Sequence, residues 1–252
     1  MLGTSLDLAT LAIVFAGALI AGFTTGFAGF GTGLVASGLW FHALPAVMVP
    51  PLVALASVAG QLVGFVTVRK AFDWPRTLPY LVGGAIGIPL GVVALAAVSP
   101  FWLKTSAGAF LIVYSLYQLL VRRRREIGAW GGKVADGIVG VGGGFLGGFA
   151  GLSGPLPLIW LQLRGGASEA QRATYQPFNL IVLALACVGM AIGGQLTVPV
   201  LWIALLCLPA TLAGAWLGAR LYGGVSAQTF QRLVLGLLLG SGAILIAQAL
   251  GA

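Results

Sequence analysis

Six apolar stretches, each close to twenty residues long, make up nearly half of the chain. A helix needs about 20 apolar residues to cross the hydrocarbon core of a bilayer. The stretches lack the alternating ten-residue pattern of a transmembrane β-barrel. The pattern therefore predicts an all-α polytopic membrane protein, with spanning helices at residues 47–68, 78–98, 102–121, 177–194, 198–219 and 233–250.

Two further apolar segments are crowded with glycine. The denser one holds eight glycines and two prolines in the eighteen residues 140–157. Inside a helix, glycine costs roughly 1 kcal/mol relative to alanine and proline about 3 kcal/mol, so this composition predicts broken backbone. In a membrane such backbone lines a cavity or is buried in protein, and transporters build substrate sites from it near the bilayer midplane. Close helix packing through small residues is the alternative interpretation.

The glycine-rich pattern occurs twice, which indicates an internal duplication. The tetrapeptide GFAG appears at residues 26–29 and again at 148–151, which is 122 residues later. GIPLG at residues 87–91 is matched by GAWLG at 214–218. We therefore expect two homologous halves.

Each half is expected to contain one glycine-rich broken or re-entrant segment plus three spanning helices. The predicted halves are residues 1–126 and 127–252. In the first half, apolar residues 8–21 and 34–41 flank the glycine cluster, and neither flank reaches the length of a span. They predict either two short tilted helices or a re-entrant hairpin whose tip is GFAGFG.

The distribution of charge favours the re-entrant form. The chain is 59% apolar and only 7% charged, with a net charge of +8. If each glycine-rich segment returned to the side it entered, the basic residues would divide twelve to one between the two sides, against eight to five for single crossings. Because Lys and Arg accumulate in cytoplasmic loops, we favour an inverted repeat with both termini outside and residues 122–125 in the cytoplasm. The two GFAG tips would then meet near the middle of the membrane.

An anion held at those tips would need hydrogen-bond donors. Broken helices offer free backbone N–H groups and the positive ends of half-helix dipoles. The candidate binding residues are the tip glycines, nearby hydroxyls and the amides of two predicted spans: Gly26, Gly29, Gly148, Gly151, Thr24, Thr25, Thr32, Ser153, Gln61, Gln176 and Asn179. The amides have helix-to-helix hydrogen bonds as an alternative role, and the hydroxyls have bonds to their own helix backbone.

Two charged or titratable side chains have two interpretations each. Arg172 is either a surface ion-pair partner of Glu169 or a guanidinium that attracts anions at the cytoplasmic mouth. His42, the single histidine, is expected to be solvated or to cap a helix more readily than to transfer protons.

The order of motifs in the second half is shared with a known family. Arg172, Ala173 and Thr174 follow a short basic loop, residues 164–169, and precede a predicted span. Together with the glycine-rich opening of each half and the prolines after it, this order resembles the TauE/SafE family of sulfite and organosulfonate transport proteins. The resemblance covers nearly the whole chain. It implies a multi-pass transporter of the bacterial inner membrane that moves small anions such as sulfite or sulfoacetate out of or into the cell, with export as the predicted direction.

The sequence lacks the residues that other functional classes require. The five acids, Asp7, Asp73, Glu126, Asp136 and Glu169, fall in or beside predicted loops, so we expect no proton-relay carboxylate within the spans. The sequence has no Walker loop, zinc motif or catalytic triad spacing, which predicts neither an enzyme nor a metal or cofactor site. The basic charge follows loop orientation and does not indicate a nucleic-acid partner. The expected partners are a small anion and the lipid bilayer; a carrier of another solute and a non-transporting membrane scaffold are the alternatives.

Overall fold

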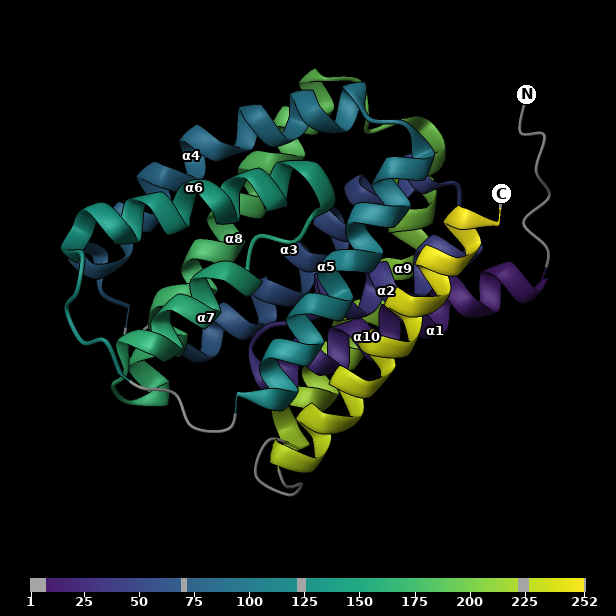
Figure 1. The fold of residues 1–252 in the computed structure, drawn as a ribbon. Helices are drawn as coiled ribbons and strands as arrows, with labels where there is room; N and C mark the ends of the chain where they lie inside the picture. The colour runs from purple at the N-terminus through teal and green to yellow at the C-terminus, as the bar shows by residue number, and fades with distance from the viewer. Residues whose placement is uncertain (1–7, 69–71, 122–125, 222–226, 252) are drawn as a thin grey trace.

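The computed structural model describes residues 8–68, 72–121, 126–221 and 227–251, and the regular structure in those residues is entirely helical (Figure 1). The predicted all-α class is confirmed. The basic cluster at residues 122–125 lies outside the described residues. The helices are α1 (Leu8–Ala28), α2 (Thr32–Ala43), a 3-10 turn η1 (Ala46–Met48), α3 (Val49–Val68), α4 (Trp74–Ala97), α5 (Pro100–Leu120), α6 (Gly132–Ala150), α7 (Pro155–Arg164), α8 (Ser168–Ile192), α9 (Val198–Leu221) and α10 (Ala227–Leu250).

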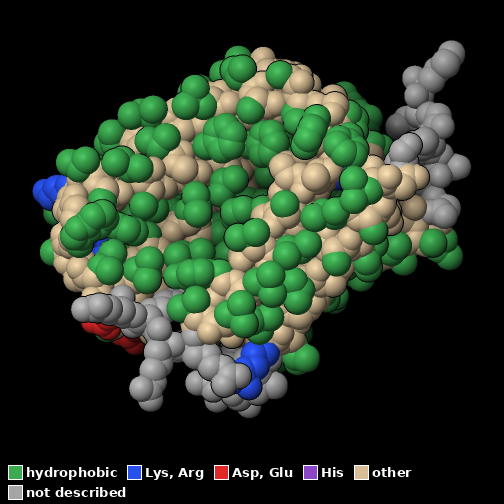
Figure 2. Space-filling view, in the orientation of Figure 1, with side chains coloured by type: hydrophobic (Ala, Val, Ile, Leu, Met, Phe, Trp, Pro, Cys, Tyr) green, Lys and Arg blue, Asp and Glu red, His purple; other side chains and the backbone are tan. Residues whose placement is uncertain are grey.

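Six of the described helices are long and apolar enough to cross a bilayer: α1, α3 with its preceding turn, α4, α8, α9 and α10. Hydrophobic side chains cover much of the face in Figure 2, and most visible Lys and Arg atoms lie near its left and lower edges. Five of the six helices correspond to predicted spans. The remaining predicted span, residues 102–121, forms the 21-residue helix α5, which is not one of the six. The sixth helix that is long and apolar enough to cross a bilayer is instead α1.

Helix α1 corrects one expectation. Residues 8–21 were expected to be too short for a span, yet the helix continues through the glycines to Ala28 and is 21 residues long. The reason is a tertiary contact with α9. A Cβ atom on Gly22 or Gly26 would overlap the backbone of α9 at Thr211 or Ala215, so these glycines allow two helix backbones to touch. That packing offsets their low helix propensity.

The same arrangement accounts for three glycines of the dense segment, Gly140, Gly144 and Gly148. Helix α6 runs unbroken through Gly140 and Gly144, which press against the backbone of α4 at Tyr80 and Gly84. Figure 1 shows α4 and α6 lying side by side. Helix packing, the alternative interpretation, therefore explains the α6 glycines that face α4, and the backbone breaks only after Ala150.

Each broken segment folds as a helical hairpin. In the first, the indole nitrogen of Trp40 near the end of α2 donates to the carbonyl of Val14 near the start of α1, at 3.0 Å. In the second, Trp160 of α7 donates to Asp136 near the start of α6 at 2.7 Å, and Arg164 pairs with the same carboxylate at 2.9 Å. The short helix thus returns to the end where the long helix began.

The hairpins open toward opposite ends of the helix bundle. Helices α5 and α10 are antiparallel neighbours, because Gly108 packs on Gly242 while Tyr114 shares a cavity wall with Leu235. His42 at the end of α2 bonds to Gln248 at the end of α10, 3.1 Å away. Arg164 at the end of α7 instead donates to carbonyls of residues 128–132, which follow the far end of α5.

We expect Gly144→Ala to lower the unfolding temperature, because its Cβ would overlap the carbonyl oxygen of Gly84. Overpacking of this kind typically costs 1–3 kcal/mol. The measurement is thermal unfolding in detergent. Gly240→Ala in α10 is the matched control, since no atom lies within 4 Å of the new methyl group, and it should be neutral or slightly stabilising. Equal unfolding temperatures for both variants would exclude the packing role of Gly144.

Candidate functional site

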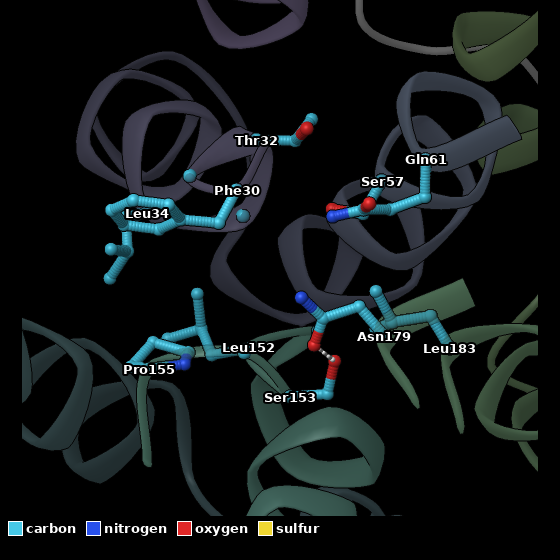
Figure 3. Close-up of a pocket in the computed structure, with 14 residues that line it drawn as sticks. Phe30, Thr32, Leu34, Ser57, Gln61, Leu152, Ser153, Pro155, Asn179 and Leu183 are labelled. Carbon is cyan, nitrogen blue, oxygen red and sulfur yellow. Dashed lines mark hydrogen bonds between the residues drawn. The ribbon is translucent and has the colours of Figure 1, made fainter. Parts of the chain in front are cut away.

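The tips of the two hairpins enclose a small cavity, which we name the inter-hairpin cavity (Figure 3). Its volume is about 20 Å³. It is walled by the two breaks and by helices α3 and α8. The lining residues are Phe30, Gly31, Thr32, Gly33, Leu34, Ser57, Gln61, Gly151, Leu152, Ser153, Gly154, Pro155, Asn179 and Leu183.

Left-handed glycines form the two breaks. Gly29 and Gly151 follow the last residues of α1 and α6 with φ of 81° and 72°, and Gly31 has φ of 106°. Residues that carry a side chain rarely adopt such φ angles, whereas glycine adopts them readily. A Cβ atom on Gly33 would lie 2.8 Å from the carbonyl oxygen of Gly151, so the two tips touch.

A helix from the other predicted half of the chain contacts each break. A Cβ atom on Gly29 would lie 2.7 Å from the hydroxyl of Tyr175 and 3.0 Å from the amide nitrogen of Gln176, both on α8. One on Gly151 would lie 3.0 Å from the backbone of Pro50 and Ala54, both on α3. Helices α3 and α8 also pack on each other. Both tips are thus clamped where the halves meet.

The two short helices offer different numbers of backbone donors to the cavity. The first turn of a helix has N–H groups without intrahelical partners. In α2 the Thr32 N–H donates to the Thr25 hydroxyl at 2.9 Å, which leaves the N–H groups of Gly33 and Leu34 in the cavity wall. Proline occupies positions 155 and 157 in α7 and has no N–H. The start of α2 is therefore the richer donor.

Buried polar side chains complete the wall. Ser57 and Gln61 are 2% and 3% exposed, and their Oγ and Oε1 atoms have no hydrogen-bond partner among the described residues. The Asn179 Oδ1 accepts from the Ser153 hydroxyl at 3.0 Å. Figure 3 shows the Asn179 amide nitrogen turned toward the cavity, with the Gln61 side chain on the facing wall. Unpaired buried polar atoms are costly, so this wall is suited to a polar ligand.

The structure brings together five of the twelve candidate residues named from the sequence. Thr32, Gln61, Gly151, Ser153 and Asn179 line the cavity. Ser57 was missed, although a hydroxyl one helical turn before Gln61 lies on the same face of α3 and was a usable signal.

Four more candidates surround the first break. The hydroxyls of Thr25 and Thr32 are hydrogen-bonded to each other. The Gln176 amide donates to the carbonyl of Gly29 at 3.2 Å. The guanidinium of half-buried Arg172 lies beside Gly29, where a Cβ atom would be 2.8 Å from its Nε.

The remaining three lie away from the cavity. Gly26 and Gly148 contact the neighbouring helix backbones at Ala215 and Ile88. The Thr24 hydroxyl donates to the carbonyl of Ile20 in its own helix, 2.8 Å away. This bond is the alternative role predicted for the hydroxyls.

Two titratable side chains are engaged in structural contacts. Asp136 lies inside α6, where it accepts from Tyr80 at 2.6 Å and from Trp160, and pairs with Arg164. The ring nitrogens of His42 contact Gln248 and Ser241 at 3.1 and 3.0 Å. In the described part of the chain, no cluster of three or more His, Cys, Asp or Glu side chains could hold a metal ion.

Comparison with known proteins identifies a family. The family model described as "Sulfite exporter TauE/SafE" matches residues 14–245. Neither the curated proteins nor the solved structures contain a match.

Proposed function

Because the chain belongs to the TauE/SafE family of sulfite exporters, we propose that it exports a small sulfur-containing anion, such as sulfite or an organosulfonate, across the bacterial inner membrane. The anion would bind in the inter-hairpin cavity. One observation carries this assignment: two helix breaks, free helix N–H groups and the unpaired hydroxyl of buried Ser57 converge on one cavity.

The cavity chemistry suits an oxyanion. The N–H groups of Gly33 and Leu34 and the amide of Asn179 are donors, and the start of α2 carries a positive partial charge. None of the described residues in its wall is Lys, Arg, Asp or Glu. Neutral donors bind an anion less tightly than a buried arginine would, so the anion can leave the site again. Gly26, Gly148 and Thr24 have no direct contact with the anion in this proposal.

The size of the cavity favours a compact head group. Its volume is about 20 Å³, and one water molecule needs roughly 10–15 Å³ by this measure. A sulfite or sulfonate group would therefore require only a small outward movement of the tips. Arg172, beside the first tip, would attract anions toward it.

We propose that the two halves form an inverted repeat across the membrane, with boundaries near residue 126. The opposite openings of the two hairpins support this arrangement, and so does the twelve-to-one division of basic residues. We expect tags at both termini to be accessible from the periplasm and a cysteine at residue 128 to react only from the cytoplasm. Impermeant thiol labelling of whole cells and inverted vesicles measures both. Termini in the cytoplasm would contradict the inverted repeat.

We expect anion flux to follow the membrane potential, because the proposed site contains no carboxylate to couple protons. Moving one charge through 100 mV is worth about 2.3 kcal/mol, enough to expel an anion from a cell that is negative inside. The test measures sulfite efflux from proteoliposomes under an imposed potassium-diffusion potential, with sulfate, thiosulfate, sulfoacetate and taurine compared.

His42→Ala should retain this flux. Flux that ignores the potential, follows a pH gradient and disappears in the His42 variant would contradict uniport. Flux of none of these solutes would favour another substrate or a scaffold role.

A further inference from the structure

A second, larger cavity adjoins the inter-hairpin cavity. Its volume is about 270 Å³, and we name it the vestibule. The two cavities share Phe30, Gly31 and Leu34 as wall residues. Gln162 near the end of α7, Ser168 at the start of α8 and other glutamines give the vestibule a partly polar wall.

The vestibule lies toward one end of the bundle. Its wall includes Gln162, Gln171 and Gln231, which lie near the end of α7 and the starts of α8 and α10. The connections at that end carry Arg164, and Arg232 follows in α10. Because Lys and Arg accumulate in cytoplasmic loops, these residues predict that this end faces the cytoplasm.

Phe30 lines both cavities and has the largest side chain of the three residues that they share. It is the single residue between Gly29 and Gly31, whose φ angles are 81° and 106°. Its ring meets the ring of Tyr175 edge to face, with centroids 6.2 Å apart. The Tyr175 hydroxyl donates to the carbonyl of Ala28 at 3.1 Å and holds the tip against α8. A large apolar ring thus lies between two glycines that permit backbone rotation.

The second hairpin has no such arrangement. Leu152 is the counterpart of Phe30, because each directly follows its GFAG motif. It is 2% exposed and lines the inter-hairpin cavity, but it is not part of the vestibule wall. The approach from the basic end therefore leads past Phe30 and not past Leu152.

We propose that Phe30 is the inner gate of the transporter, an aromatic plug whose displacement connects the vestibule with the anion site. This role rests on the proposed function. Hydrophobic constrictions block hydrated ions by excluding water. Rotation about Gly29 and Gly31 would move the ring into the vestibule, where there is room for it, and would leave the donors of Gly33 and Leu34 in place.

The test measures how fast a reagent reaches the inter-hairpin cavity. The reporter is Ser57→Cys in a chain carrying Cys187→Ala and Cys207→Ala, in lipid nanodiscs that expose both faces. The probe is sulfonatoethyl methanethiosulfonate, a small anionic thiol reagent. Phe30→Ala should speed its reaction with residue 57 at least tenfold, and Phe30→Leu should give an intermediate rate. Leu152→Ala, which removes an apolar side chain from the same cavity, should change the rate less than twofold.

The graded series keeps the proposal falsifiable if one variant folds poorly, since Phe30→Leu alone should still react faster than the parent. Equal rates along the series, or equal acceleration by Leu152→Ala, would overturn the gate. The assay requires no transported substrate. Absence of anion flux in liposomes would thus contradict the proposed function, while a flat labelling series would contradict only the gate.

Discussion

Gly29→Ala and Gly151→Ala should each reduce anion flux to background while the protein still inserts into the membrane. Both glycines have left-handed φ angles, where a side chain costs of order 1–3 kcal/mol. The new methyl groups would also meet close neighbours, the hydroxyl of Tyr175 in one case and the backbone of Ala54 in the other. Each tip would be pushed from the helix that holds it, and the donors around the cavity would separate.

Gly194→Ala tests whether backbone strain away from the two tips is enough to reduce flux. Gly194 has φ of 76° between α8 and α9, and no atom lies within 4 Å of the methyl group that alanine would add. The variant carries a similar backbone penalty without a contact at either tip. We expect proteoliposome flux near the parent value for Gly194→Ala, with membrane content measured by quantitative blotting for all three. Normal flux in either tip variant would remove that tip from the site.

Asn179→Leu should weaken anion binding and flux by about 10- to 100-fold, because a lost hydrogen bond to a charged group is worth about 1.5–3 kcal/mol. The substitution removes the amide that faces the cavity and leaves the Ser153 hydroxyl without its acceptor. Asn179→Asp keeps the shape but introduces negative charge beside an anion, so its loss should be larger. The measurements are initial flux and the anion-dependent rise in unfolding temperature.

Gln118→Leu provides the matched control for an amide. Gln118 is 8% exposed in α5 and donates to the Tyr114 hydroxyl at 3.1 Å, and it is not among the cavity-lining residues. Its replacement should lower stability without changing the anion-dependent shift in unfolding temperature. If Asn179→Leu and Gln118→Leu reduced flux equally, the Asn179 effect would be one of helix packing alone.

The sequence predicted the all-helical membrane class, which the structure confirms, and the positions of the two helix breaks. Apolar length alone identified α3, α4, α8, α9 and α10, because hydrocarbon thickness fixes the length of a span. The repeat of GFAG located both breaks, since only the last glycine of each copy has a positive φ. Thr32, Gln61, Ser153 and Asn179 were found as polar residues inside apolar surroundings.

Features that depend on tertiary contact were not predictable in this way. Gly22 and Gly144 have the same low helix propensity as the glycines of the breaks, and only the neighbouring helix backbones explain why they remain helical. The vestibule joins Tyr114 of α5 to Gln231 of α10, positions more than a hundred residues apart.

The crossed support of the tips has a consequence for assembly and ancestry. Gly29 rests on α8 and Gly151 rests on α3, so each half supplies the brace for the hairpin of the other. If the halves are related as we propose, a half-length ancestor could have built the inter-hairpin cavity only by pairing two copies inserted in opposite orientations. In the full chain, neither predicted half contains the whole cavity wall, and we expect a chain cut between α5 and α6 to transport the anion only when both fragments are made together.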